Sequence, residues 1–339
     1  MEIILFLPWV LSFLVALVLM PPWIKKAKQI GLIWEDMNKF KHPKNVAGSG
    51  GIVVLIAFIV GTLSYIAIKT FFFKTNIQTI EIFALLTIVI MAAMIGFVDD
   101  IFGWTRGGLS AKVRVVLVFV SAIPLMVINA GHSQMNIPLI GAVNFGILYP
   151  LLLIPLGIIA TTTTFNFLAG FNGLEARQGI IVIFALSVVS YLTGNSWLTM
   201  IGLCMVASLF VFLLYNHNPA KVFGGDILTY SVGALIGCMA IIGNFEKIAF
   251  VIFTPYILEV ILKVRGKLKK QSFGIPQKDG SLEMPYDKIY GLEHLAIYIL
   301  KKIKPSKKVY ENDVVLLING FQILVICFAF FVFRWNLSP

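Results

Sequence analysis

Charge is scarce in this chain of 339 residues, since Asp, Glu, Lys and Arg together make up only 13% of it. A soluble domain carries about 25% charged residues and is roughly half apolar even when Gly is counted. Here 59% of the residues are apolar before Gly is counted. These residues fall into runs of about 20, the length that a helix needs to cross a bilayer core. The composition excludes a soluble fold and predicts an all-α, polytopic membrane protein.

Cysteine is equally scarce, and its placement excludes two further kinds of fold. The cysteines lie inside apolar stretches, without a Cys-x-x-Cys pair, at Cys204, Cys238 and Cys327. Neither a disulfide framework nor a zinc site is therefore supported.

The sequence begins with Met1-Glu2, without a basic region or a small-residue cleavage site. We expect the first apolar run to be a retained span that ends at Pro21-Pro22.

The apolar runs predict about ten transmembrane helices, joined by connections of alternating character. The spans are expected at 3–20, 50–68, 82–98, 111–130, 146–164, 178–193, 197–215, 228–243, 247–264 and 313–333. The Lys and Arg residues gather in every second connection, with the exceptions of Lys69, Lys74, Lys247 and Arg334. The positive-inside rule places those basic connections in the cytoplasm and both termini outside. The net charge of +11 thus orients the protein, and nucleic acid is not an expected partner.

No repeat and no break in composition divides the chain, so residues 1–339 are expected to form a single membrane-embedded domain. Its longest basic connection, 265–311, is predicted to form a cytoplasmic excursion. Within it, apolar residues recur at helical spacing beside lysines, from Ile289 to Ile303. That pattern is typical of an interfacial helix, which lies in the layer of lipid headgroups.

Several acidic residues lie at the ends of the predicted spans on the cytoplasmic side, and Glu259 is the only acid clearly within a span. Asp99-Asp100 close the third span, Glu175 follows the fifth, and Asp226 precedes the eighth. A transporter or proton channel usually places ionisable groups near the bilayer midplane, where its substrate must cross. Carboxylates at one surface, beside basic loops, instead indicate a site for a metal ion and an anionic substrate. We therefore predict phosphate chemistry at the inner membrane surface, and a transporter is less favoured.

The first motif joins two adjacent aspartates to two cations. Asp99 and Asp100 would repel each other in a dry environment unless water or a cation offsets their charge. A solvated helix terminus would also explain them. The run 107–114 follows at once, and its Lys112 and Arg114 begin the next span beside these acids. Those two cations are either membrane anchors or phosphate ligands.

The second motif, 161–175, carries carboxamides and glycines at the end of the fifth span. Its threonines are explained by bonds to their own helix, a common use of Thr in membrane helices. Asn166 and Asn172 are harder to explain in that way, because their carboxamides could ligate a hard cation or bind a nucleobase edge. Gly170 and Gly173 would let a ligand approach the backbone.

The third motif, 216–226, ends in Gly224-Gly225-Asp226 just before a predicted helix. The N–H groups at a helix N-terminus favour phosphate binding. As an isolated feature, Asp226 is explained more simply as the cap of that helix.

Together the motifs resemble those of the polyprenyl-phosphate N-acetylhexosamine-1-phosphate transferases, glycosyltransferase family 4, and most closely the branch that makes GlcNAc-diphosphodolichol. The resemblance runs from about residue 30 to the C-terminus. The matching segments are Asp36–Lys39, Phe97–Asp100, Asn166–Ala176, Val222–Asp226 and Leu282–Tyr286. Bacterial-type and dolichol-type features are mixed, as expected of an archaeal protein. Two departures stand out: Thr163 replaces an asparagine of the family, and the late loop lacks its Arg-His-Arg or His-x-His cluster.

The resemblance implies a Mg²⁺-dependent enzyme, with Mn²⁺ as an alternative, that moves GlcNAc-1-phosphate from UDP-GlcNAc to a polyprenyl or dolichyl phosphate. The reaction would release UMP at the cytoplasmic face of the cell membrane, as the first step of lipid-linked glycan assembly for protein N-glycosylation. Another UDP-sugar, such as UDP-GalNAc or UDP-MurNAc-pentapeptide, is an alternative donor. A transporter of lipid or nucleotide sugar is the less favoured class, and a homodimer is left open.

The resemblance also implies roles for individual residues. Asn166 and Asp226 would bind the metal ion, and Asp99 and Asp100 would shape the catalytic centre beside it. The substrate-binding residues implied are Asp36, Lys112 and Arg114 with Asn172 and Phe223, and the late-loop lysines Lys267, Lys269 and Lys270. Among these, Lys112 and Arg114 would hold the lipid phosphate, whereas Asn172 and Phe223 would hydrogen-bond and stack on uracil. The late-loop lysines would face the diphosphate or the sugar.

Overall fold

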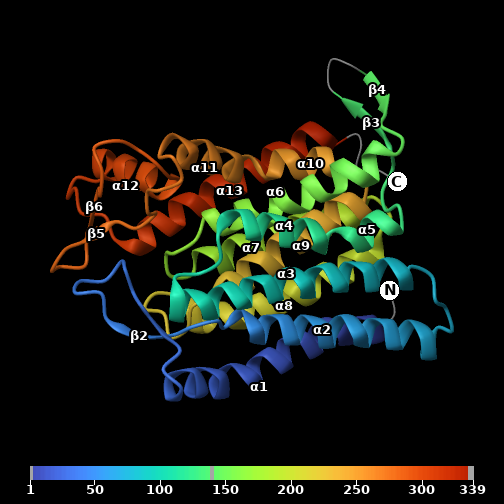
Figure 1. The fold of residues 1–339 in the computed structure, drawn as a ribbon, viewed down its shortest axis with the longest axis horizontal. Coiled ribbons are helices and arrows are strands. Elements are labelled where there is room, and N and C mark those ends of the chain that lie inside the picture. The colour runs from blue at the N-terminus through green and yellow to red at the C-terminus, as the bar shows by residue number, and fades with distance from the viewer. Residues whose placement is uncertain (1–2, 138–140, 335–339) are drawn as a thin grey trace.

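The computed structural model describes residues 3–137 and 141–334 as a bundle of helices (Figure 1). The expectation for Met1-Glu2 lies outside the described residues. The helices are α1 (Leu7–Gln29), α2 (Gly51–Ala67), α3 (Thr79–Arg106), α4 (Ala111–Ser121), α5 (Ile123–Val127), α6 (Ile154–Phe167), α7 (Leu174–Leu192), α8 (Ser196–Asn216), α9 (Asp226–Ile242), α10 (Glu246–Ile252), α11 (Thr254–Arg265), α12 (Leu292–Ile303) and α13 (Glu311–Phe333). One 3₁₀ turn, η1 (Ile3–Phe6), and two π-helical turns, η2 (Ile68–Phe72) and η3 (Tyr149–Leu153), adjoin them.

Three short antiparallel hairpins make up the strands of the described residues. They are β1 (Ile33–Glu35) with β2 (Lys44–Ala47), β3 (Gln134–Ile137) with β4 (Gly141–Asn144), and β5 (Ile275–Pro276) with β6 (Leu282–Glu283). Figure 1 shows β2, β5, β6 and α12 at one end of the bundle and β3 and β4 at the other. The first end holds the connections that the sequence predicts to be cytoplasmic.

Seven helices of the described part are long and apolar enough to cross a membrane. They comprise Ile4–Gln29, Gly51–Phe72, Thr79–Thr105, Tyr149–Phe167, Leu174–Leu192, Ser196–Asn216 and Glu311–Phe333. The all-α, polytopic fold is thereby confirmed. The other expected spans coincide with shorter helices, because α9 has 17 residues and the runs 111–130 and 247–264 are each divided into two helices. The count of ten and the placement of the termini stay predictions.

Several helix ends differ from the sequence prediction. Pro21-Pro22 do not end α1, which continues to Gln29. Both prolines are exposed, so water or headgroups can solvate the carbonyls that a proline leaves unpaired. Helix α3 likewise continues past Asp99-Asp100 to Arg106, and α7 begins early enough to include Glu175 in its first turn. The acids therefore lie on helices rather than in loops.

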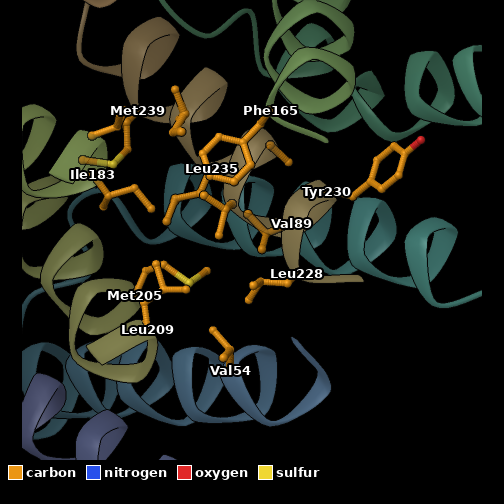
Figure 2. Close-up of a cluster of buried hydrophobic side chains, with 14 of the residues drawn as sticks. Val54, Val89, Phe165, Ile183, Met205, Leu209, Leu228, Tyr230, Leu235 and Met239 are labelled. Atoms are coloured by element: carbon orange, nitrogen blue, oxygen red, sulfur yellow. The ribbon is translucent and has the colours of Figure 1, made fainter. Parts of the chain in front are cut away.

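The core surrounds α9, which packs against α2, α3, α6, α7 and α8. Nearly every side chain of α9 is buried. Figure 2 shows its Leu228 and Leu235 among Val54 of α2, Val89 of α3 and Phe165 of α6. Because neighbours enclose α9 on several sides, its first residue, Asp226, has a fixed position relative to α3 and α6.

The predicted cytoplasmic helix is present as α12. Leu292 and Ile297 are buried, and the helix packs against α11 and α13. Tyr298 and Ile303 are exposed. Much of the predicted apolar face therefore contacts the bundle itself, and contact with lipid headgroups stays a prediction for the remaining exposed residues.

Candidate functional site

A cavity of about 620 Å³ lies where the ends of α3 and α6 meet the start of α9. Its wall includes side chains from five separate segments of the chain, among them Trp34, Asp100, Asn166, Phe223, Asp226 and Phe273. The three sequence motifs thus meet in one place, as predicted. Two smaller hollows lie elsewhere around His132 and Asn244, without the aspartates of these motifs.

Asp100 caps the N-terminus of α9 from the neighbouring helix α3. Its carboxylate accepts a hydrogen bond from the backbone N–H of Asp226 at 2.7 Å and one from the Ser49 hydroxyl at 2.9 Å. A carboxylate at this position also interacts favourably with the helix dipole. Asp226 taken in isolation was explained most simply as this cap, but Asp100 takes that role, which leaves the Asp226 side chain to face the cavity.

The turn before Asp226 requires glycine. Gly225 has a φ of +75°, and a Cβ at this position would lie 2.1 Å from Oδ2 of Asp100. Neither the conformation nor the space suits a larger residue. The Gly-Gly-Asp sequence therefore lets α9 begin directly against the carboxylate of α3.

Gly225→Ala is expected to lower the free energy of unfolding by more than the about 1–3 kcal/mol that such a conformation costs a non-glycine residue, because the clash of its Cβ with Asp100 adds to that cost. The matched control is Gly280→Ala, because Gly280 has a similar φ of +80° but open space around its Cβ position. Thermal unfolding of the two purified variants measures the difference. Equal shifts in Tm would show that the contact with Asp100 is unimportant.

Arg114 joins two of the aspartates. Its Nη1 lies 2.9 Å from Oδ2 of Asp99 and 3.6 Å from Oδ2 of Asp226. Asp99 also accepts the backbone N–H of Leu109, which folds the 107–110 turn back onto α3. One guanidinium therefore offsets the charge of two carboxylates, while Lys112 is exposed on the first turn of α4.

Asn166 lies on the cavity wall near the end of α6. Its Oδ1 accepts a hydrogen bond from the hydroxyl of Thr229 at 3.0 Å, which orients the carboxamide. Thr163, where the family has an asparagine, donates its hydroxyl to the carbonyl of Ile159 at 2.6 Å. The helix bond expected for the threonines therefore accounts for Thr163, whereas Asn166 faces the cavity.

The oxygens on this wall suit a hard cation that the substrate helps to bind. Among residues 3–137 and 141–334 there is no group of three or more His, Cys, Asp or Glu arranged to hold a metal ion. An all-protein cage is therefore not built here. Mg²⁺, however, is usually bound by one or two carboxylates together with waters and substrate phosphates. The carboxylate of Asp226 and the carboxamide of Asn166 fit that mode of binding.

Other predicted residues lie away from the cavity wall. Asn172 is buried, and its Nδ2 donates to Oδ2 of Asp36 at 2.9 Å. Lys267, Lys269 and Lys270 are exposed and do not line the cavity. Their loop places Gln271 and Phe273 on the cavity wall, and Phe223 also lines the cavity.

Sequence reasoning missed several residues of the site. Ser49 bonds Asp100, Trp34 lines the cavity, and Thr229 orients Asn166. The glycines around Ser49 indicate that the backbone there lies close to another part of the protein, but no sequence pattern pointed to Trp34 or Thr229.

The buried His294 does not supply the missing imidazole of the late loop, because it does not line the cavity. Burial, with the nearby charge of Lys263, lowers its pKa to about 4.

Comparisons with known proteins identify similar chains and a matching family. The family model of glycosyl transferase family 4 matches residues 82–244, which include Asp99, Asp100, Asn166 and Asp226. A relative from Saccharolobus solfataricus, provisionally named UDP-N-acetylglucosamine–dolichyl-phosphate N-acetylglucosaminephosphotransferase, is 33% identical over 86% of this chain and 87% of its own. The protein of that name from Dictyostelium discoideum is 29% identical over 76% of this chain and 69% of its own. A phospho-N-acetylmuramoyl-pentapeptide-transferase from Streptococcus pyogenes is 29% identical over 78% of this chain and 82% of its own.

The fold, the site and these similarities define a membrane-embedded glycosyl phosphotransferase. The chain belongs to glycosyl transferase family 4. The resemblance seen in the sequence motifs is thereby confirmed.

Proposed function

We propose that this protein transfers GlcNAc-1-phosphate from UDP-GlcNAc to a polyprenyl or dolichyl phosphate, releasing UMP and forming GlcNAc-diphospho-polyprenol. The observation that carries this proposal is the meeting of Asp226 and Asn166 on the wall of one cavity, with Arg114 3.6 Å from the carboxylate of Asp226. The names of the Saccharolobus and Dictyostelium relatives support this choice of donor and acceptor. The product would begin a lipid-linked glycan for protein N-glycosylation.

The acceptor needs positioning more than activation. A phosphate monoester has a second pKa near 6, so the lipid phosphate is largely ionised at neutral pH and needs no strong general base. Its oxygen attacks the phosphorus that bears the sugar, and UMP leaves. In this proposal Arg114, with Lys112 on the same turn of α4, holds the acceptor phosphate and offsets the charge that spreads over the transferred group.

Asp226 and Asn166 would hold Mg²⁺ or, alternatively, Mn²⁺. When bound, such an ion neutralises charge on the diphosphate and on the leaving UMP. Asp100 fixes the start of α9 and therefore the place of Asp226, while Asp99 orients Arg114. In this proposal the two adjacent aspartates act through position and charge.

The active site is proposed to face the cytoplasm, where UDP-sugars are available. Lys44 of β2 lines the cavity, and β2 lies at the same end of the bundle as β5, β6 and α12 (Figure 1). The basic connections of the sequence lie at that end, which the positive-inside rule assigns to the cytoplasm. Labelling of a cysteine introduced at exposed Lys269 in intact cells, with and without permeabilisation, would check this orientation.

The donor sugar is the least constrained part of the proposal. The Streptococcus relative carries the name of a transferase for phospho-N-acetylmuramoyl-pentapeptide, so UDP-MurNAc-pentapeptide is the second candidate donor. The test incubates purified protein with Mg²⁺, polyprenyl phosphate and a panel of UDP-sugars including UDP-GalNAc. The mass of the lipid product identifies the sugar. If UDP-MurNAc-pentapeptide alone gave a lipid product, it would replace UDP-GlcNAc as the proposed donor. If no donor gave a lipid product, the proposed activity would be refuted.

Phe223→Ala is expected to raise the KM for UDP-GlcNAc by about tenfold, since stacking on an aromatic side chain contributes about 1–3 kcal/mol per base. Phe223 lies on the cavity wall immediately before the glycines that precede α9. Steady-state kinetics of UMP release measures the effect, and Phe223→Tyr should retain most of the affinity. An unchanged KM for Phe223→Ala would remove the stacking role.

A further inference from the structure

The segment Asp36–Lys39, between β1 and β2, is held by hydrogen bonds to distant parts of the chain. Asp36 and Asn38 are 4% and 2% exposed, and Lys39 is partly buried. A polar segment that is buried in this way must satisfy its hydrogen-bonding groups within the protein. The partners of this segment therefore indicate what it does.

Asn38 connects two walls of the cavity. Its Nδ2 donates to the carbonyl of Gly170 at 2.9 Å, and its Oδ1 accepts the backbone N–H of Gly274 at 3.2 Å. Gly170 lines the cavity, as does Phe273, the neighbour of Gly274. One carboxamide thus holds together backbone that is more than 100 residues apart in the sequence.

Asp36 and Lys39 hold Asn172 through its side chain and its backbone. Oδ2 of Asp36 accepts from Nδ2 of Asn172 at 2.9 Å. The backbone N–H of Asn172 donates to Oε1 of Glu311 at 2.7 Å, and Oε2 of the same carboxylate pairs with the ammonium of Lys39. Lys39 also donates to Oδ1 of Asn218 at 2.6 Å. The chain on either side of Phe171, a cavity residue, is therefore fixed by this one segment and α13.

In the proposed reaction, the walls that are held in this way would face the water-soluble donor. Gly170, Phe171 and Phe273 lie in loops outside the membrane-spanning helices, where a water-soluble UDP-sugar arrives. The acceptor enters from the bilayer with its lipid chain. Within the segment itself, Met37 is the residue that lines the cavity. Asp36, Asn38 and Lys39 would thus act on the donor through the walls that they hold.

We propose that Asp36–Lys39, together with Glu311, is a positioning clamp that shapes the donor side of the cavity and sets the affinity for the UDP-sugar. This inference rests on the proposed function. It gives Asp36 an indirect role, through Asn172, in place of the direct substrate contact that the family resemblance implies.

Asn38→Leu tests the clamp, because leucine has the same branched arrangement of side-chain heavy atoms as asparagine but makes neither hydrogen bond. We expect the KM for UDP-GlcNAc to rise by about tenfold, equivalent to about 1.4 kcal/mol. The KM for polyprenyl phosphate and kcat should change by less than about twofold, since the loss concerns donor binding alone. Glu311→Gln is the second variant, should Asn38→Leu fail to fold, and is expected to shift the same KM in the same direction.

Lys301→Met is the matched control, because Lys301 pairs with Glu283, and neither residue lines the cavity. Removal of that ion pair should leave the KM for UDP-GlcNAc unchanged. Folded variants of Asn38 and Glu311 with an unchanged donor KM would overturn the clamp. A fall in kcat with both KM values unchanged would also overturn it, since it would indicate only less active protein.

Titration of the same proteins with UMP separates this inference from the proposed reaction. If the wild-type protein binds UMP but forms no lipid product, the proposed transfer is wrong while the clamp can still be measured. In that case, Asn38→Leu and Glu311→Gln should each weaken UMP binding relative to Lys301→Met. Equal binding by all the variants would refute the clamp independently of turnover.

Discussion

Asp226→Asn is expected to lower Mg²⁺-dependent release of UMP by about 1000-fold, a loss of the size seen when one preorganised electrostatic contact to a transition state is removed. The backbone of Asp226 is held by Asp100, and its carboxylate lies 3.6 Å from Arg114. Asparagine has nearly the same shape and keeps the backbone hydrogen bond. The substitution therefore removes the negative charge while the start of α9 stays in place. We expect kcat to fall while Tm stays close to that of the wild type.

The control for this substitution is Asp279→Asn. Asp279 is an exposed aspartate that pairs with Lys308 and does not line the cavity. The pairing lowers the pKa of Asp279 below its ordinary value, so this control also removes a full negative charge at neutral pH. UMP release should stay near the wild-type rate. If Asp226→Asn, purified in folded form, released UMP at a comparable rate, Asp226 would not be a metal ligand.

The meeting of the three motifs could be predicted from the sequence because the ends of membrane helices fall on known sides. Alternate loops share one face of the bilayer, so Asp99-Asp100, Asn166 and Asp226 were expected at the same surface. The structure brings Asp100, Asn166 and Asp226 to one cavity, and Arg114 links Asp99 to Asp226. Which atom contacts which could not be predicted in this way. The hydrogen bond between Asp100 and the backbone of Asp226 joins residues 126 positions apart and depends on how α3 packs on α9.

The loops were the least predictable part of the site. The family resemblance assigned the late-loop lysines to the diphosphate or the sugar, but Lys270 lies over the ring of Tyr286 at 4.6 Å, and the neighbouring Gln271 lines the cavity. Helical periodicity carries no information about such a turn. Glu311 was also missed, because an acid in the first turn of a helix is ordinarily explained by the helix dipole. Its contacts with Lys39 and Asn172 arise only from the tertiary fold.

Arg114→Met is expected to lower kcat/KM for polyprenyl phosphate by about 1000-fold, at the lower end of what an arginine contributes in phosphoryl transfer. Methionine keeps an apolar stem of similar reach but has no charge to hold the acceptor phosphate. The loss should also leave Asp99 and Asp226 without the guanidinium that lies between them. Both effects weaken the approach of an anionic acceptor, because uncompensated carboxylates repel it. The affinity for UMP, measured by titration, should change much less.

Arg114→Lys distinguishes charge from geometry. Lysine restores the positive charge but lacks the fork that can contact two carboxylates at once. We therefore expect activity between that of Arg114→Met and the wild type. Arg334→Met is the control, because Arg334 follows the last turn of α13, at the opposite end of that helix from Glu311, and lies over the ring of Phe331. If Arg114→Met kept the wild-type kcat/KM for polyprenyl phosphate, Arg114 would serve only to offset the aspartates, and the acceptor phosphate would have to be held by Lys112 or by another group.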